Sequence, residues 1–184
     1  QEVACFARAL QCSPSRIRVA DLLSGWPSAR EFELADVIFL GGSGDYSAAG
    51  DGEWLQSILV GLRQLCDSDK AVFASCWGFQ VISKALGGDV ITNLDQAELG
   101  TTEVTLTNAG AKVPVFGSLG ALFQAQMGHQ AIVTRLPREA ILLASTDRVK
   151  NEAFCFPDKC WYCTQFHPEL RLADLVERLT QYPE

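Results

Sequence analysis

The chain has 184 residues, of which 48% are hydrophobic and 20% charged, a composition typical of a globular domain with a buried core. A net charge of −7 at pH 7 argues against nucleic acid or an anionic membrane surface as a partner. No apolar run approaches the roughly 18 residues of a membrane span and no signal-peptide pattern opens the chain. Seven scattered cysteines fit a reduced compartment, so we expect a cytoplasmic protein.

The first half of the chain alternates between helical and strand-like patterns. The sequence predicts a helix from Glu2 to Leu10 and a short strand from Ile17 to Val19. A continuous apolar strand follows at Val37–Leu40, as expected in a parallel sheet that is buried on both faces. Apolar residues at helical spacing then predict an amphipathic helix from Trp54 to about Asp67.

Cys76 lies between a predicted strand and a predicted helix. Four apolar or small residues precede Ser75 and Cys76, and a helical pattern runs from Phe79 to Leu86 before Gly87-Gly88. A strand, a sharp turn and a helix with the cysteine on the turn form a nucleophile elbow. Free N–H groups at the N-terminus of such a helix can bind an anion. Taken alone, a free cysteine is more often a small hydrophobic core residue than a nucleophile.

The second half contains several short strand patterns with little helix between them. A final helix from Leu170 to Leu179 closes the chain, and four apolar side chains are expected to face inward, namely Leu172, Leu175, Val176 and Leu179. The expected strands are Val104–Thr107, Ala131–Thr134, Ile141–Ser145, Ala153–Phe156 and Trp161–Phe166. The fold class is therefore α/β, a doubly wound, mostly parallel sheet with flanking helices and a small antiparallel extension.

His129 and His167 are the only histidines, so a cysteine–histidine pair must use one of them. Pro168 favours an extended His167, and residues two apart on an extended chain point the same way. His167 and Glu169 can therefore share a face, where the carboxylate orients the imidazole and the imidazole activates a thiol. The alternative is an ordinary strand end with a solvated glutamate.

Two motifs together resemble those of the class I glutamine amidotransferases. Cys76, Gly78 and Gln80 match the family's nucleophile motif Gly-x-Cys-x-Gly-x-Gln, although Ala74 stands where the family has glycine. Gln165-Phe166-His167-Pro168-Glu169 matches the family's second signature, about 90 residues later and before a C-terminal helix. The resemblance implies a flavodoxin-like fold and a catalytic triad of Cys76, His167 and Glu169.

The resemblance also implies where an oxyanion would bind. Gly41-Gly42-Ser43-Gly44 follows a strand and is similar to the family's oxyanion loop, so Gly42 and Gly44 are implied in binding, together with the amide of Trp77. A phosphate-binding or merely flexible loop is the alternative, and a P-loop is excluded because no Gly-Lys-Ser/Thr follows.

The glutamine end of the substrate would contact two further segments. Gln80 is implied in holding the α-amino acid end, and Gly128-His129-Gln130-Ala131 corresponds to a segment that grips the same end, largely through main chain, at Gln130 and Ala131. Many relatives have serine or asparagine where this chain has Gly128, which leaves room for a γ-glutamyl peptide or amide as substrate. We expect His129 to be structural. Asn151-Glu152-Ala153-Phe154 and Glu98-Leu99-Gly100 resemble the branch containing the GMP-synthase glutaminase domain.

The implied activity is hydrolysis of the glutamine side-chain amide through a γ-glutamyl thioester, with ammonia passed to a separate synthetase subunit or released. A γ-glutamyl conjugate hydrolase and a catalytically silent binding module of the same fold remain alternatives. No cofactor or metal is expected. Cys155, Cys160 and Cys163 do not suit a metal site, because positions 160 and 163 face opposite sides of a strand, and a packed Cys155–Cys160 pair across a turn is the simpler interpretation.

We expect one glutamine amidotransferase domain over residues 1–184. Members of the family open with an apolar strand before the first helix, and this sequence opens on a helix. Either the N-terminus is truncated or the sheet lacks one strand.

Overall fold

The computed structural model describes residues 2–181, without the side chains of residues 179 and 181. Six α-helices are described: α1 (Glu2–Ala9), α2 (Ala29–Glu33), α3 (Glu53–Cys66), α4 (Trp77–Ala85), α5 (Pro114–Gly117) and α6 (Leu172–Gln181). The strands are β1 (Val37–Leu40), β2 (Ala71–Ser75), β3 (Asp89–Thr92), β4 (Glu98–Leu106), β5 (Leu122–His129), β6 (Ala131–Arg135), β7 (Ile141–Ser145), β8 (Ala153–Cys155) and β9 (Trp161–Thr164). Short 3₁₀ turns occupy Pro14–Arg16, Leu94–Gln96 and Gly110–Lys112.

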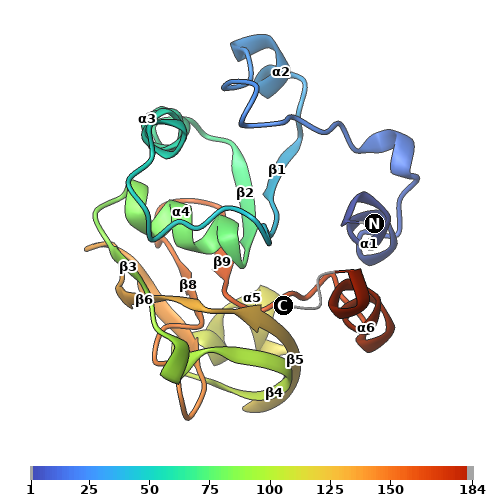
Figure 1. Ribbon diagram of the computed structural model, residues 1–184, viewed down its shortest axis with the longest axis vertical. Coiled ribbons are helices and arrows are strands. Elements are labelled where there is room, and N and C mark those ends of the chain that lie inside the picture. Colours follow the sequence, from blue (N-terminus) through green and yellow to red (C-terminus); the bar gives the residue numbers. More distant parts are fainter. Residues whose placement is uncertain (1, 182–184) are drawn as a thin grey trace.

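Seven strands form one sheet in the order β1-β2-β9-β8-β7-β4-β5, and β3 pairs with β6 separately. The pairs β1–β2 and β2–β9 are parallel, whereas every pairing from β9 to β5 is antiparallel. The predicted α/β sheet with flanking helices is confirmed. The antiparallel part, which includes the long curled β4–β5 hairpin in Figure 1, is larger than the expected extension.

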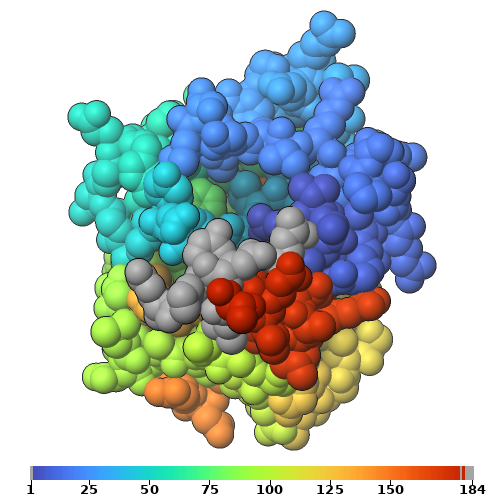
Figure 2. Space-filling view, turned by 45° about the vertical axis from the view of Figure 1, so that its right-hand side comes forward, coloured from blue at the N-terminus to red at the C-terminus, as the bar shows by residue number. Residues whose placement is uncertain are grey.

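Helices cover both faces of the parallel strands (Figure 1). Helix α4 packs on β2 and against α3 on one side, where apolar residues such as Ile58, Leu62, Phe79 and Ile82 are almost fully buried. On the other side, the Phe6 ring of α1 lies 5.3 Å from the Phe39 ring of β1. Figure 2 shows α1 and α6 side by side, where Arg8 and Asp174 form an ion pair. The ends of β1, β2 and β9 therefore lie between two helical layers.

Several predicted elements differ from the structure. Residues 17–19 form no strand, and Val19 is exposed. Helix α6 buries Leu175, but Leu172 and Val176 are exposed, so two of the predicted inward positions are wrong. The side chain of Leu179 lies outside the described residues. Among residues 2–181, no helix is both long and apolar enough to cross a membrane.

Candidate active site

Cys76 lies on a strained turn between β2 and α4, as predicted. Its backbone has φ 52° and ψ −106°, in a region that a non-glycine residue seldom occupies. The Cys76 N–H donates to the carbonyl of Thr164 at 2.8 Å, and the N–H of Gly78 donates to Gly41 at 3.1 Å. A Cβ at Gly78 would come within 2.4 Å of the Leu40 carbonyl oxygen, so only glycine lets α4 approach β1 this closely. These contacts hold the cysteine at the N-terminus of α4.

Ala74 is accommodated where the resembling family has glycine. The residue is fully buried on β2, with Leu40 of β1 and Cys163 of β9 as its register partners. Neither neighbouring strand is displaced from regular pairing, so the extra methyl group leaves the strand before the elbow intact.

His167 and Glu169 form a buried pair at the end of β9. His167 Nδ1 lies 2.6 Å from Glu169 Oε1, and both residues are less than 5% exposed. The N–H of His167 donates to the Gln126 carbonyl at 2.9 Å, which fixes the histidine against β5. Ser75, the neighbour of Cys76, has its hydroxyl 3.5 Å from the same Glu169 oxygen. The predicted shared face of His167 and Glu169 is present, and it faces the elbow.

The surroundings of His167 favour the protonated form of its imidazole. Burial lowers its pKa, but the charge of Cys76, a hydrogen bond with Cys76 and the Glu169 carboxylate outweigh burial and raise the pKa to about 10. Because Nδ1 is bonded to Glu169, Nε2 is the nitrogen left for the thiol. The raised pKa suits this imidazole to donate a proton beside the sulfur of Cys76.

The loop after β1 lies against the histidine ring. A Cβ at Gly42 would come 2.8 Å from His167 Cε1 and 3.6 Å from Nε2. The Gly42 N–H donates to the Glu2 carboxylate at 2.9 Å, and Arg178 of α6 lies 3.8 Å from the same oxygen. The amide expected to face an oxyanion is therefore already bonded to an anion. Gly44 is exposed, and no atom would contact a Cβ there.

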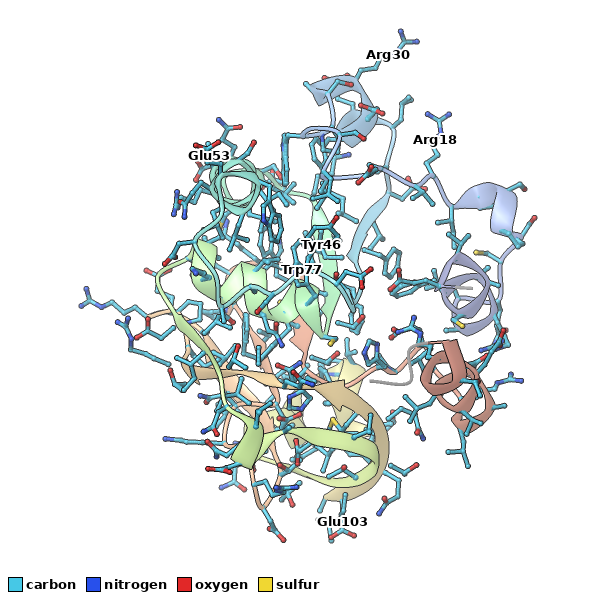
Figure 3. The ribbon with its side chains drawn as sticks, viewed as in Figure 1. Arg18, Arg30, Tyr46, Glu53, Trp77 and Glu103 are labelled. Atoms are coloured by element: carbon cyan, nitrogen blue, oxygen red, sulfur yellow. The ribbon has the colours of Figure 1, made fainter. Side chains whose placement is uncertain are left out.

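Trp77 follows the cysteine and begins α4, so its N–H is among the amides that have no partner within the helix. Its ring stacks on that of Trp54 with centroids 6.4 Å apart, and the Tyr46 ring lies edge-on to Trp54. Figure 3 labels Tyr46 and Trp77 close together. This aromatic stack holds the Trp77 side chain and fixes the first turn of α4.

The residues expected at the substrate end are brought to the same region but have different surroundings. The Gln80 side chain is buried and donates to Ala131 O at 3.0 Å and to Gln165 Oε1 at 3.1 Å, so in this structure it ties α4 to β6. Gln130 is exposed. The Gly128 carbonyl lies 3.9 Å from Cys76 Sγ, and no atom would contact a Cβ at Gly128. Substrate contacts at Gln80, Gln130 and Ala131 remain predictions.

Sequence reasoning missed two features near the elbow. The sequence predicts Glu2 only as the start of a helix, and its contact with Gly42 depends on how α1 packs. Glu98, His129 and Glu152 form the one group, among residues 2–181, whose side-chain atoms lie close enough together to hold a metal ion. The sequence indicates Glu98 and Glu152 only through the family-like segments around them, and it predicts a structural role for His129.

The three clustered cysteines near β8 and β9 do not pair. Cys155 lies opposite Tyr162 rather than Cys160, and Cys160 is exposed whereas Cys155 and Cys163 are buried. The expected Cys155–Cys160 pair is therefore wrong. All seven cysteines are free.

The fold and the elbow define an α/β protein with a cysteine at the strand-to-helix turn. The family model for glutamine amidotransferase class-I matches residues 8–179, and the chain belongs to that family. Gamma-glutamyl peptidase 3 of Arabidopsis thaliana is 29% identical over 160 residues, 84% of this chain and 64% of that protein. The glutamine-hydrolyzing GMP synthase of Vibrio cholerae is 29% identical over 141 residues, 77% of this chain and 25% of that protein.

A solved glutamine amidotransferase from Thermotoga maritima superposes with a TM-score of 0.79 at 19% identity, covering 97% of this chain and 74% of that one. This likeness confirms the fold. The chain spans less than two thirds of each of the two curated relatives. Membership of the family supports a hydrolase or amidotransferase role.

Proposed function

We propose that this chain is a glutamine amidotransferase domain that hydrolyses the glutamine side-chain amide with Cys76 as nucleophile. The observation that carries the proposal is the strained Cys76 at the N-terminus of α4 beside a buried, hydrogen-bonded His167–Glu169 pair. A thiol, a base within reach and a carboxylate that orients the base form the arrangement used for covalent catalysis.

The proposed reaction has two stages. The Cys76 thiolate attacks the carboxamide carbon, and the backbone N–H groups of Trp77 and Gly42 stabilise the oxyanion that forms. His167 donates its proton to the departing ammonia, which leaves a γ-glutamyl thioester on the sulfur. His167 then takes a proton from water, the resulting hydroxide attacks the thioester, and glutamate leaves as the thiol is regenerated.

We propose Glu169 as the group that orients His167 through the 2.6 Å contact with Nδ1. The ammonia would pass to a synthetase or be released, and a synthetase partner is supported by the relative named as a glutamine-hydrolyzing GMP synthase. For Gly42 to serve the oxyanion, the Glu2 carboxylate must first leave its N–H.

A γ-glutamyl peptide or conjugate is the second candidate substrate. It is favoured by the open space at Gly128 and by the Arabidopsis relative named gamma-glutamyl peptidase 3. The chemistry at Cys76 would be the same, with an amine leaving in place of ammonia.

The triad is tested by measuring ammonia release from glutamine and amine release from a panel of γ-glutamyl amides. Cys76→Ala should abolish turnover, by about 10,000-fold or more, with little loss of stability because the residue lies on a turn. His167→Ala should be nearly as severe, and Glu169→Ala less so. Cys160→Ala is the matched control, because Cys160 is exposed and remote from the elbow in sequence. Equal, mild effects of all three triad substitutions would show that the triad is not operating.

A further inference from the structure

Three ionisable side chains from separate segments meet in the interior beside the elbow. Glu98 begins β4, His129 ends β5 as its register partner, and Glu152 precedes β8. Their exposed fractions are 3%, 6% and 0%, and their functional atoms lie within 4.8 Å of one another. The proposed reaction uses none of these side chains.

The two carboxyl groups have different hydrogen-bonding surroundings. Glu98 accepts from the Thr146 hydroxyl at 2.8 Å and lies 3.3 Å from His129 Nε2. Neither oxygen of Glu152 has a hydrogen-bond donor among the described residues, and His129 Nε2 is 4.0 Å away. Donors favour the ionised form of a carboxyl group, and their absence in a buried site favours the neutral acid.

The charges around Glu152 also favour its neutral form. Burial raises the pKa of Glu152 well above its usual range, and the charges of Glu98 and Cys76 and a hydrogen bond with Glu98 raise it further. Two carboxylates this close in the interior cannot both ionise without a large electrostatic cost. Among residues 2–181, the ionisable groups that face Glu152 are His129 on β5, Glu98 on β4 and Cys76 on the turn before α4.

The backbone around this cluster leads to both sides of Cys76. His129 directly follows Gly128, whose carbonyl contacts Cys76 Sγ at 3.9 Å. On the other side, the Glu152 carbonyl accepts the N–H of Gln165 at 2.7 Å, two residues before His167. A change in the cluster would therefore move the segment expected to hold substrate and the segment that carries the histidine.

We propose that Glu152 is held as a neutral acid that donates its proton to an ionised Glu98, and that the two carboxyls with His129 position the Gly128 segment beside Cys76. They are positioning residues: they hold the backbone around the elbow and do not touch the reacting atoms. The effect on turnover rests on the proposed function, whereas the charge assignment does not. A divalent cation held by the same three side chains is the competing explanation.

The charge assignment is tested with two matched substitutions and one control. Glutamine resembles a protonated glutamate, so Glu152→Gln should fold and remain close to the wild type in stability at pH 6. Glu98→Gln should lower the urea midpoint strongly, because it removes the charge that accepts from Thr146, His129 and Glu152. The control is Glu103→Gln. Glu103 lies on the same strand, is exposed and points away from the body of the protein in Figure 3, so this substitution should leave the urea midpoint unchanged.

The pH dependence gives a readout that a merely structural role would not move. A pKa raised in the folded state means that folded Glu152 keeps a proton that the unfolded chain has released, so its contribution to stability falls as pH rises. The stability of Glu152→Gln relative to the wild type should therefore increase from pH 6 to pH 8.5. The proposal is overturned if Glu152→Gln fails to fold at pH 6, if Glu98→Gln is the milder change, or if the pH trend has the opposite sign.

Adding zinc chloride distinguishes a bound divalent cation from a proton shared between Glu152 and Glu98. Under the proposal, zinc leaves the wild-type melting temperature unchanged. A zinc-dependent rise in melting temperature that Glu152→Gln abolishes would overturn the proposal.

The positioning role is tested by steady-state kinetics. Glu98→Gln should raise KM for glutamine by about 10-fold through the displaced Gly128 segment, more than it lowers kcat. A wild type without turnover would reject the proposed function while the stability measurements still decide the charge assignment. If Glu98→Gln leaves KM at the wild-type value, the positioning role is wrong.

Discussion

At the scale of single residues, Gly128 decides how much room the candidate site offers. Gly128 is exposed, and no atom lies within 4 Å of the position a Cβ would take. Its carbonyl oxygen lies 3.9 Å from Cys76 Sγ, so residue 128 is close to the proposed nucleophile. A missing polar side chain at this point should weaken the hold on the α-amino acid end of glutamine.

We predict that Gly128→Ser lowers KM for glutamine by about 2- to 13-fold, the equivalent of one hydrogen bond, and leaves kcat nearly unchanged. The same substitution should reduce activity on bulky γ-glutamyl amides. Steady-state kinetics on both substrate types provide the measurement, with Gly50→Ser, another exposed position with open surroundings, as control. A tight KM for glutamine in the unaltered protein, or a higher KM in a folded Gly128→Ser variant, would contradict this prediction.

At the scale of elements, helix α1 matters because it brings Glu2 to the loop after β1. Phe6 packs on Phe39 and Arg8 pairs with Asp174, so α1 is fixed both to the sheet and to α6. This packing directs the Glu2 carboxylate at the Gly42 N–H, with Arg178 nearby. An anion bonded to that amide competes with the oxyanion of the proposed reaction.

We predict that Glu2→Ala raises kcat/KM for glutamine by about 10- to 150-fold, because it frees the Gly42 N–H from a charge-assisted hydrogen bond of roughly 1.5–3 kcal/mol. Glu2→Gln should give an intermediate value, since a neutral amide oxygen binds the N–H more weakly. Glu103→Ala controls for the loss of one negative charge far from the loop. If Glu2→Ala lowers kcat/KM while the protein stays folded, the carboxylate supports the loop rather than blocking it.

The elements themselves were predictable where the pattern is local. The strand–elbow–helix unit from Ala71 onward follows from an apolar run, a helical period and a terminal glycine pair, and β1 and α3 follow in the same way. Strand β5 was missed because Leu122–His129 buries small or flexible residues, such as Ala125 and Met127, that give no strong alternation of hydrophobicity. The curl of the sheet depends on pairings between distant segments, which no local pattern specifies.

The candidate site also contains residues that the sequence predicts and contacts that it does not predict. The two family signatures placed Cys76, His167 and Glu169, and the structure puts the three just after the neighbouring parallel strands β2 and β9. The contacts of Glu2 with Gly42 and of Glu152 with Glu98 link positions far apart in the chain. Both depend on how elements pack, so the residue types alone could not reveal them.

At the scale of the whole molecule, the buried ionisable groups determine how stability varies with pH. Glu152 and His167 both have a raised pKa, the first chiefly through burial and the second because Cys76 and Glu169 outweigh burial. In Asp174 burial raises the pKa, but the Arg171 N–H and Arg8 outweigh it and the pKa is lowered. The contribution of Asp174 to stability therefore falls as pH decreases, whereas the contributions of Glu152 and His167 fall as pH increases.

The sign of each contribution follows from proton binding. Stability from Asp174 is present above its unfolded pKa of 3.8 and is lost as pH falls further. Stability from Glu152 is complete below 4.5, and stability from protonated His167 is complete below 6.5 and is lost as pH rises toward about 10. The free energy of unfolding should therefore be greatest at mildly acidic pH and decline through the neutral and alkaline range.

We predict that urea unfolding midpoints, measured with the thiols kept reduced, peak at about pH 4.5, where the unfolded Glu152 begins to ionise, and fall steadily up to pH 9.5. His167→Gln should be less stable than the wild type at pH 6 but should show a flatter decline above pH 6.5, because glutamine keeps a hydrogen-bonding group and cannot titrate. Glu152→Gln should flatten the decline at lower pH, where the carboxyl group begins to lose its proton in the unfolded chain. A wild-type midpoint that rises between pH 6.5 and pH 9 would contradict the raised pKa of His167.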